Sequence, residues 1–569
     1  MYLQYATSKQ NGKSYTYPLL CRKYREAGKI KTEIVANLTK FPKDVILAIE
    51  GVFKNGKDIM VSLKDIVLSR SIDYGFVFVL ITIMKRLRID QALEKVLGER
   101  ANLVKLMIIG KIVTRGSKLC IFNWINRNKE IAKKLDIDLS TLKLDTLYEV
   151  LGDLSNVQSK IERKWNLYHK EKSDEIYLYD ITSSYFEGTE NALSAFGYNR
   201  DGKKGKMQIV VGLITTKDGF PLSIEVFEGN ENDHTTVISQ LQKIKIEYGA
   251  KEVVFVGDRG MRIRYNIEQL NEEEKQGIGY ITALSIEEIR CLIKEDIIQL
   301  NLFSKDLVEI ENEGERYVLC TNPILEEEHA QTRSSLKLKF EESLHEIMLS
   351  YQSRNSKNMK NKKRLANSDK NKKLVIQFSE KQIDGYKYRV RKALEKYQMQ
   401  SFFEVLITDE DFNVQFKFEK YSQAKQLDGK YVIVTNVPPE KMTKETIRNE
   451  YKNLKHVEHA FRDMKTVKLD IRPIFHVNEN TTRGHVFVTM FAYAIVRELE
   501  IKIFPWLKIM NKGKKENLSF HDIEEELKMI KLNVMRIGKN HEEIIITELT
   551  NHQKEILNIL NISNEFMVA

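Results

Sequence analysis

The sequence predicts a mixed α/β domain with helical regions on both sides of it, and two patterns support this. Between residues 171 and 284, short apolar runs alternate with turn residues, as in β-strands. One segment among them, TTVISQLQKIKIEYG, has the apolar spacing of a helix and ends on Gly249. Strands that are joined partly by tight turns and partly through helices form a mixed sheet.

The predicted strands come in a definite order. They are EIYLYDITSSYFEG, which we expect to end on Asp180, QIVVGLITT (208–216), FPLSIEVFEG (220–229), KEVVFVGDRG (251–260), which ends on Asp258, and GYITAL (279–284). The turn KDG makes the second and third strands a hairpin. This order, with helices around the fourth strand, is that of a ribonuclease-H-like domain. In that topology the first and fourth strands are neighbours, so Asp180 and Asp258 should meet at one edge, although 258 − 180 = 78 residues separate them.

The segment YKNLKHVEHAFRDMKTVKLDIRPIFH begins at Tyr451 and carries a third acidic candidate. Apolar residues at spacings of three and four predict one buried helical stripe: Leu454, Val457, Phe461 and Met464. Tyr451, Glu458 and Lys465 follow one another at intervals of seven, so they project from one side of this helix. That side could be an ordinary solvated face, or it could hold a metal ligand with phosphate contacts beside it.

Two aspartates and a glutamate are the residues that two-metal phosphoryl transfer needs. Such sites hold two Mg²⁺ ions about 3.5–4 Å apart, and Mg²⁺ prefers oxygen ligands. Asp180 and Asp258 on neighbouring strands, with Glu458 from a later helix, could form the carboxylate cluster. A single aspartate at a strand end is usually a turn residue, and it is the combination that favours a metal site.

The rest of the chain is predicted from composition and periodicity. Two regions are predicted to precede the catalytic core: a small N-terminal unit that is a candidate DNA contact (1–70) and a helical DNA-binding region (71–170). The core itself is predicted in two parts (171–284 and 437–500), separated by a mostly β insertion (285–436) that contains a mobile basic loop (353–373). A helical C-terminal region (501–569) is predicted to follow. In the first unit, a hairpin around Gly28 carries Arg22, Lys23, Arg25, Lys29 and Lys31, which could contact DNA phosphates or simply be solvated.

Composition narrows the class of protein. Hydrophobic residues make up 42% and charged residues 30%, as in globular proteins. The net charge of 91 − 80 = +11 favours a polyanionic partner, nucleic acid before membrane. The four cysteines show no CxxC spacing, which argues against a zinc module or a disulfide framework. The most apolar runs are far shorter than the roughly 20 residues of a membrane span, and no signal peptide opens the chain.

The motifs YLYDITSSYFEG, VGDRGM and YKNLKHVEHAFRDMK resemble the three catalytic motifs of DDE transposases from bacterial insertion sequences. They are similar to the group with a Y-x2-R-x3-E-x6-K signature and a β-rich insertion before the glutamate helix. FGYNRDGK, GFPLSIEVFEGNENDH, LDGKYVIVTN and RPIFHVNENTTRGHVF also resemble this group. The resemblance is strongest over 175–290 and 425–495.

The resemblance implies that Asp180, Asp258 and Glu458 are catalytic and bind two Mg²⁺ ions, for which Mn²⁺ can substitute. It also implies that Tyr451 and Lys465 contact the DNA end. The signature places arginine where this chain has Leu454, and Lys455 or Arg462 could make that phosphate contact instead. Arg259, directly after Asp258, could contact a phosphate or pair with a carboxylate.

The predicted function is therefore that of a DNA transposase in the bacterial cytoplasm, associated with the nucleoid through DNA. It would bind the inverted-repeat ends of its element, cleave the DNA and join the 3′-hydroxyl ends to target DNA. Because two ends must be processed together, we expect a dimer on double-stranded DNA and no membrane association. The alternatives are a hydrolytic nuclease of the same fold and a transposase-derived DNA-binding protein without activity.

The resemblance further implies that the insertion helps to form a DNA hairpin at the transposon end. In such a reaction a flipped base is held out of the stack, and an aromatic side chain can stabilise it there. The candidates are Tyr397, Phe402, Phe403, Phe416, Phe418, Tyr421 and Tyr431, most of which are expected to be core residues.

Overall fold

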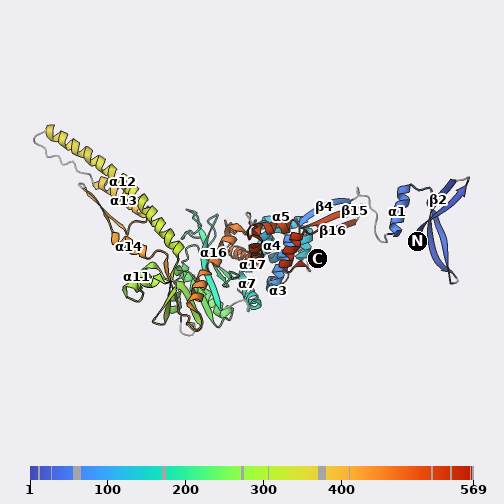
Figure 1. Cartoon of the computed structure of the whole chain (residues 1–569), viewed down its shortest axis with the longest axis horizontal. Helices are drawn as coiled ribbons and strands as arrows, with labels where there is room; N and C mark the ends of the chain where they lie inside the picture. Colours follow the sequence, from blue (N-terminus) through green and yellow to red (C-terminus); the bar gives the residue numbers. More distant parts are fainter. Residues whose placement is uncertain are drawn as a thin grey trace. The chain divides into compact units, whose positions relative to one another are not determined.

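The computed structural model of this chain describes all residues except 11–12, 27, 55–65, 170–174, 271–274, 306, 369–379, 409–410, 514–516, 538–540, 564–565 and 567–569. The chain divides into two compact units. Unit 1 consists of Met1–Thr82 and Glu500–Ala569, and unit 2 consists of Ile83–Leu499 (Figure 1). Of the helices in the described residues, none combines the length and the hydropathy that a membrane span requires.

Unit 2 is built on a mixed sheet of eight strands in its described part, in the order β10-β11-β14-β9-β8-β5-β6-β7. The strands are β5 (Ile176–Tyr185), β6 (Gln208–Thr215), β7 (Pro221–Phe227), β8 (Val253–Val256), β9 (Ile278–Ala283), β10 (Leu307–Asn312), β11 (Glu315–Thr321) and β14 (Lys430–Thr435). β5 pairs antiparallel with β6 and parallel with β8, which confirms that the first and fourth predicted strands are neighbours.

The central strands form because their apolar runs are buried on both faces. All residues of β6 and β8 are buried, and in β5 only Asp180 and Tyr185 are partly exposed. The predicted turn after β6 is also confirmed, because β6 and β7 pair antiparallel around Gly219, whose φ of 76° suits glycine. Gly219 donates its N–H to the carbonyl of Thr216 at 2.9 Å and closes the turn.

Helices precede and surround this sheet. The helices before it are α2 (Gly75–Arg86), α3 (Ile89–Leu97), η2 (Gly98–Arg100), α4 (Ala101–Thr114), α5 (Lys118–Arg127), α6 (Lys129–Lys134) and α7 (Leu144–Tyr168). Those within and after it are η3 (Asp233–Thr236), α8 (Val237–Gln242), η4 (Lys243–Glu247), η5 (Arg259–Met261), α9 (Ile263–Glu268), α11 (Ile286–Lys294), η6 (Leu300–Ser304), α14 (Phe418–Gln426), α15 (Lys444–Lys452), α16 (Lys455–Arg462), η7 (Asp463–Val467) and α17 (Glu479–Met510). Trp165 of α7 packs on Phe220 and Phe491 and joins α7 to the sheet and to α17.

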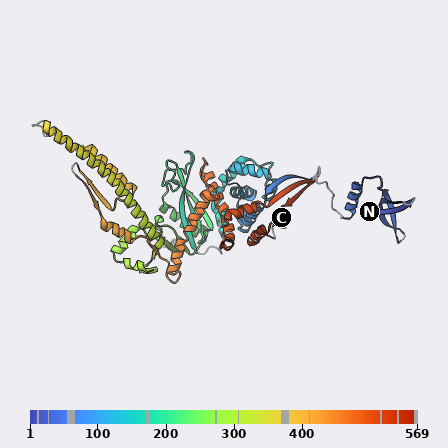
Figure 2. The ribbon, with the colours of Figure 1, turned by 45° about the horizontal axis from the view of Figure 1, so that its top comes forward.

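The insertion is mainly helical, so the prediction of a mostly β insertion was wrong. α12 (Pro323–Ser368) and α13 (Glu380–Lys396) run side by side as an arm, with the hairpin β12 (Phe403–Ile407) and β13 (Phe412–Phe416) beside them (Figures 1 and 2). The arm has its own hydrophobic core, which includes Phe340, Leu344, Ile347, Tyr351, Tyr386, Val390, Phe403 and Phe412.

The sequence contains the signal for α12. Phe340, Leu344, Ile347 and Tyr351 follow one another at spacings of four, three and four, which is a helical stripe. The predicted basic loop 353–373 was also wrong in its first part, because residues 353–368 continue α12. A polar sequence can remain helical when it extends a helix that is already anchored by packing. The rest of that predicted loop, 369–373, lies outside the described residues.

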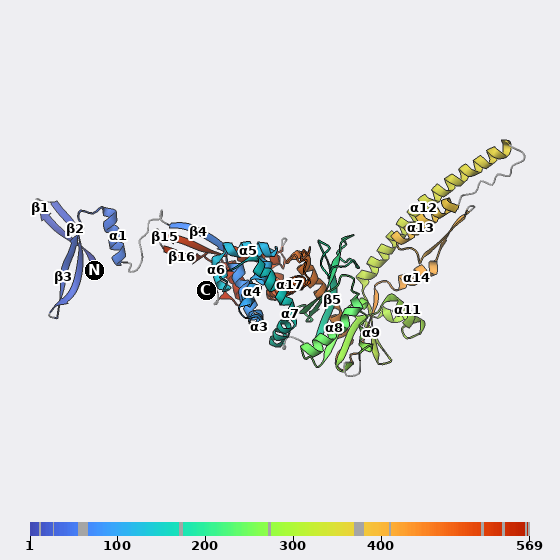
Figure 3. The same cartoon turned by 180° about the vertical axis from the view of Figure 1, so that it is seen from behind.

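Unit 1 contains two small sheets. β1 (Tyr2–Gln10), β2 (Lys13–Glu26) and β3 (Lys29–Asn37) form one, followed by α1 (Lys43–Lys54), and the strands are labelled in Figure 3. The other consists of β4 (Ile66–Asp73), β15 (Lys531–Ile537) and β16 (His541–Ile546), accompanied by α18 (Phe520–Lys528) and α19 (Asn551–Ile559). Beside this second sheet the rings of Tyr74, Phe78 and Phe566 pack together.

The second sheet corrects two predicted boundaries. The region 501–569 is not purely helical, because β15 and β16 lie within it. The predicted N-terminal unit 1–70 also cuts through β4, which pairs with β15. Lys531 lies opposite Asp73, and such a pairing over hundreds of residues leaves no mark in local periodicity.

Candidate active site

Asp180 and Asp258 reach the same edge of the sheet through the register of β5 and β8. The parallel pairs run from Ile176 opposite Val254 to Leu178 opposite Val256, an offset of 256 − 178 = 78 residues. The two aspartates have the same offset, 258 − 180 = 78, and lie two residues beyond the last pair. Both side chains therefore emerge where β8 has ended and leaves the edge of β5 open.

The strand end predicted at Asp180 was wrong, because β5 continues to Tyr185. Asp180 lies opposite Leu213, so β6 keeps the strand extended while β8 stops. Asp258 instead caps the short helix η5 and accepts the N–H of Arg259 at 2.8 Å. Asp180 accepts the N–H of Ile181, also at 2.8 Å.

Glu458 comes from α16, whose apolar side faces the sheet. The predicted stripe is confirmed as buried, since Leu454, Val457, Phe461 and Met464 are at most 9% exposed. Packing of this side against β5 and β6 leaves Glu458 exposed on the other side. The segment is not a single helix, because α15 ends at Lys452 and a π-helical turn, η7, holds Lys465.

The three carboxylates line the same hollow surface. Two pockets share Asp180, Asp258 and Glu458 in their walls. One pocket continues along Thr182, Arg200, Asp201, Asp233, Arg462, Lys465 and Arg472. The other continues along Arg259, Tyr431, Tyr451, Lys452 and Lys455 toward the start of α12.

The electrostatics of this edge suit a cation. Burial, together with the negative charges of Asp258 and Glu458, raises the pKa of Asp180 to about 7, although the N–H of Ile181 opposes this shift. A divalent ion would offset the repulsion among the three carboxylates, which adds to the effect of burial on this pKa. The oxygens of the three carboxylates are not all within 4.8 Å of one another, so no single ion could contact all three in this conformation.

The comparisons with known proteins identify the family of this chain. The family model of the transposase DDE domain matches residues 171–495, more than half of the 569 residues. The chain belongs to the DDE transposases. The N-terminal domain of IS1634 family transposases matches residues 3–58, so this is an insertion-sequence transposase, as the sequence motifs predict. Its activity is metal-dependent DNA cleavage and strand transfer, and the family uses divalent metal ions.

One solved structure similar to this transposase is the cryo-EM structure of the piggyBac transposase synaptic complex with hairpin DNA. The TM-score is 0.31 at 7% sequence identity, and the similarity covers 80% of this chain and 70% of that chain. A similarity this low supports no inference about the chain. A comparison with curated proteins found no match.

Tyr451 and Lys465 lie at the site but already have partners in the transposase. The Tyr451 hydroxyl donates to Oδ1 of Asp258 at 3.4 Å, and its ring stacks on Tyr431 with centroids 6.4 Å apart. Lys465 is buried and donates to the hydroxyl of Thr182 at 2.6 Å and to Asp201 at 2.8 Å. Arg259, Lys455 and Arg462, by contrast, are exposed in the pocket walls.

Sequence reasoning missed the ionic network that holds Lys465. The side chain of Asp201 is only 2% exposed, and it pairs with Lys465 and Arg472 and accepts the N–H of Tyr185 at 3.1 Å. The neighbouring Arg200 pairs with Asp233 at 2.5 Å in the wall of the same pocket. The motif FGYNRDGK contains both residues, but its resemblance to the family carried no role for either of them.

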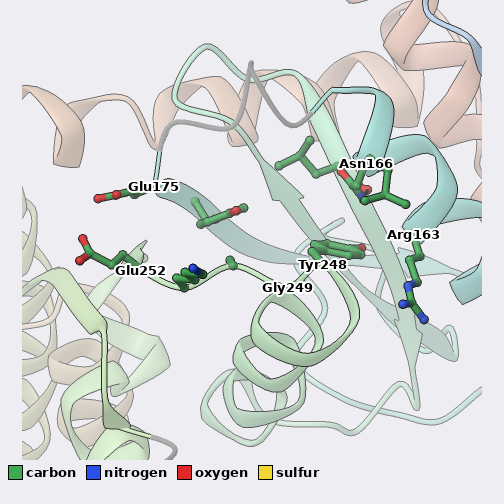
Figure 4. Close-up of a pocket in the computed structure, with 11 residues that line it drawn as sticks. Arg163, Asn166, Glu175, Tyr248, Gly249 and Glu252 are labelled. Carbon is green, nitrogen blue, oxygen red and sulfur yellow. Dashed lines mark hydrogen bonds between the residues drawn. The ribbon is translucent and has the colours of Figure 1, made fainter.

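A further pocket of unit 2 has a different character (Figure 4). It is lined by Arg163, Asn166, Glu175, Tyr248 and Glu252, among others. Glu175 and Glu252 both pair with Lys441, and Asn166 donates to the carbonyl of Leu222. None of the three catalytic candidates lines this pocket, so it does not belong to the active site.

Proposed function

We propose that the transposase cuts the inverted-repeat ends of its element with Asp180, Asp258 and Glu458 as ligands of two Mg²⁺ ions, Mn²⁺ being a substitute. The observation that carries this proposal is the shared offset of 78 residues, which brings Asp180 and Asp258 to one sheet edge beside Glu458. The strands β9-β8-β5-β6-β7 would be the ribonuclease-H-like core, since their order matches that topology.

The donor set suits magnesium. All three candidate ligands are carboxylates, and Mg²⁺ prefers oxygen ligands while it keeps waters and substrate phosphates in its shell. When bound, two such ions supply charge neutralisation at the reacting phosphate and lower the pKa of an attacking hydroxyl or water.

The residues around the carboxylates would bind and orient the DNA. Arg259, Lys455 and Arg462 are exposed cations in the pocket walls, so they can contact phosphates directly. Lys455 and Arg462 could therefore supply the contact that the family signature assigns to arginine, since Leu454 is buried. Lys465 would approach a phosphate only if it exchanged its bond to Thr182 or Asp201 for that contact. The Tyr451 hydroxyl could likewise turn from Asp258 to a phosphate.

A strand-transfer assay tests this function. The full chain would be incubated with Mg²⁺, a labelled duplex that carries the element's terminus and a plasmid target. We expect nicks at the element boundary and joined products. Cleavage without joining would indicate a hydrolytic nuclease, and binding without cleavage would indicate an inactive transposase-derived protein.

We expect a dimer on DNA, because two ends must be cut and joined in one assembly. Light scattering of the protein–DNA complex, with Ca²⁺ in place of Mg²⁺ to avoid cleavage, would give its mass. The expected mass is that of two chains and two end duplexes. An active complex with one chain for two ends would contradict this prediction.

A hairpin intermediate at the transposon end is the next expectation. Tyr431, from the far end of the insertion, lies in the pocket wall stacked on Tyr451, where it could support a base turned out of the duplex. Denaturing gels of a labelled end should show a slow-migrating hairpin after nicking, and Tyr431→Ala should reduce this species more than the first nick. Phe418→Ala, an exposed aromatic of α14, is the control. Double-strand breaks without a hairpin at any time would give the insertion another role.

A further inference from the structure

The ribbon formed by the ends of β2 and β3, defined here as Arg22–Glu26 with Lys29–Glu33, stands apart from the rest of its sheet. β1 pairs with β2 only as far as Tyr2 opposite Cys21, so beyond Cys21 the sheet has two strands. Every residue of the ribbon is exposed. A two-stranded ribbon without a covered face is marginally stable in water, and a binding partner would stabilise it.

The ribbon is basic, and its charges are divided unevenly between its two faces. It holds five cations and two acids, 5 − 2 = +3, whereas the whole chain has a net charge of +11. Arg22 lies opposite Glu33, and Glu26 lies opposite Lys29. Residues directly opposite each other share a face, and so do residues two or four positions apart on one strand. Glu33, opposite Arg22, and Glu26 therefore lie on the same face. There Arg22 pairs with Glu33, and Lys31 pairs with Glu26, each at 2.6 Å.

The opposite face carries cations without any acidic residue of the ribbon. Lys23 lies opposite Thr32 and Arg25 opposite Ile30, so these four side chains point the same way. Ile34, the next residue of β3 on this face, lies opposite Cys21. Tyr2 of β1 touches the near end of this face, with its ring 5.2 Å from Nζ of Lys23 and its hydroxyl 3.5 Å from that of Thr32. Beyond Tyr2 the face is open, since Ile30 is 64% exposed and Ile34 is 60% exposed. It offers positive charge, a hydroxyl and apolar surface together.

We propose that this ribbon enters the major groove of double-stranded DNA with the Lys23 and Arg25 face toward the base edges. The major groove is wide enough for a two-stranded ribbon, and it presents the acceptors of guanine and the methyl group of thymine. Lys23 and Arg25 suit those acceptors, and Ile30 and Ile34 suit the methyl groups. The other face, with its paired charges, would lie toward the backbones. A second copy of the chain is a poorer partner, because Lys23 and Arg25 would face their own counterparts.

This inference deepens the proposed function, because it assigns recognition of the element's end to a surface outside the catalytic sheet. It is tested with the full chain in EDTA, so that binding is measured without cleavage. The probes are a fluorescent duplex of the element's terminus and a duplex with the same bases in scrambled order. The variant is Lys23→Gln/Arg25→Gln. Its matched control is Lys29→Gln/Lys31→Gln, which removes the same charge from the other face. Thermal melting verifies that each variant is folded.

We expect Lys23→Gln/Arg25→Gln to weaken binding to the terminal duplex by about tenfold or more and to abolish the preference over the scrambled duplex. The control variant Lys29→Gln/Lys31→Gln should weaken binding to both duplexes by the same factor, so that the preference for the terminal duplex remains. Methyl green, which occupies the major groove, should displace the wild-type chain, whereas netropsin in the minor groove should not.

Unchanged binding by Lys23→Gln/Arg25→Gln would overturn the proposal. Equal effects of the two double variants would also overturn it, because they would indicate attraction by charge alone. A concentration-dependent dimer that is lost in Lys23→Gln/Arg25→Gln would point to a second copy of the chain instead. Failure of the proposed catalytic function would appear separately, as absence of strand transfer by a wild-type chain that still prefers the terminal duplex.

Discussion

Replacement of Asp180, Asp258 or Glu458 by alanine should lower the rate of DNA-end cleavage by about 10³-fold or more, or about 4 kcal/mol of transition-state stabilisation. The reason is that each substitution would remove one ligand of the proposed two-ion site. The ions of such a site neutralise the negative charge at the reacting phosphate. Binding of the end should persist, because in the proposed site most phosphate contacts would come from residues other than the metal ligands. Initial cleavage rates and band shifts on one labelled end fragment would separate the two effects.

The matched control for these variants is Asp218→Ala. Asp218 is an exposed aspartate in the turn between β6 and β7 of the same sheet, and it lines neither of the pockets that hold the three carboxylates. The Asp218→Ala variant should cleave the DNA end at the wild-type rate. Near-wild-type cleavage by any of the three triad variants would remove that residue from the proposed metal site, whatever the other two did.

The second large effect is expected at the base of the arm, where Arg333 of α12 pairs with Asp428. Both terminal nitrogens of the guanidinium group donate to the carboxylate, Nη1 at 2.5 Å from Oδ2, and the Asp428 side chain is only 3% exposed. Asp428 directly precedes Gly429 and β14, so this pair ties the arm to the catalytic sheet. Arg333→Met would leave a buried carboxylate without its partner and should cost about 3–5 kcal/mol.

Urea unfolding of the full chain, with hydrogen exchange to localise the change, would measure this cost. The double variant Arg333→Met/Asp428→Leu should recover most of the lost stability, because no charge remains buried. Arg391→Ala breaks an exposed pair with Glu395 on the same arm and should cost less than about 1 kcal/mol. If Arg333→Met is as mild as Arg391→Ala, the pair does not secure the arm.

Much of the catalytic sheet could be predicted because its signals are local. Runs such as QIVVGLITT are almost entirely apolar, which is typical of strands buried on both faces. The KDG turn between two such runs predicts a hairpin. Glu458 could be placed on a helix side because Val457 and Phe461 mark the buried side. The arm carries an equally local signal, the apolar stripe that runs from Phe340 to Tyr351. Its strand-like and lysine-rich stretches nevertheless led to the wrong prediction of a mostly β insertion with a mobile loop.

The sequence by itself determined the strands β5 to β9 of the catalytic sheet, their order along the chain, and the acidic residues of the candidate site. Local side-chain periodicity and turn chemistry carry that information. Only the tertiary structure decided that β8 stops two residues before Asp258 while β5 continues past Asp180, which opens the edge between them. It also decided that Asp201 holds Lys465 and that β4 pairs with β15. These outcomes depend on packing and charge pairing between residues that are 78 to more than 400 positions apart, so local sequence patterns do not reveal them.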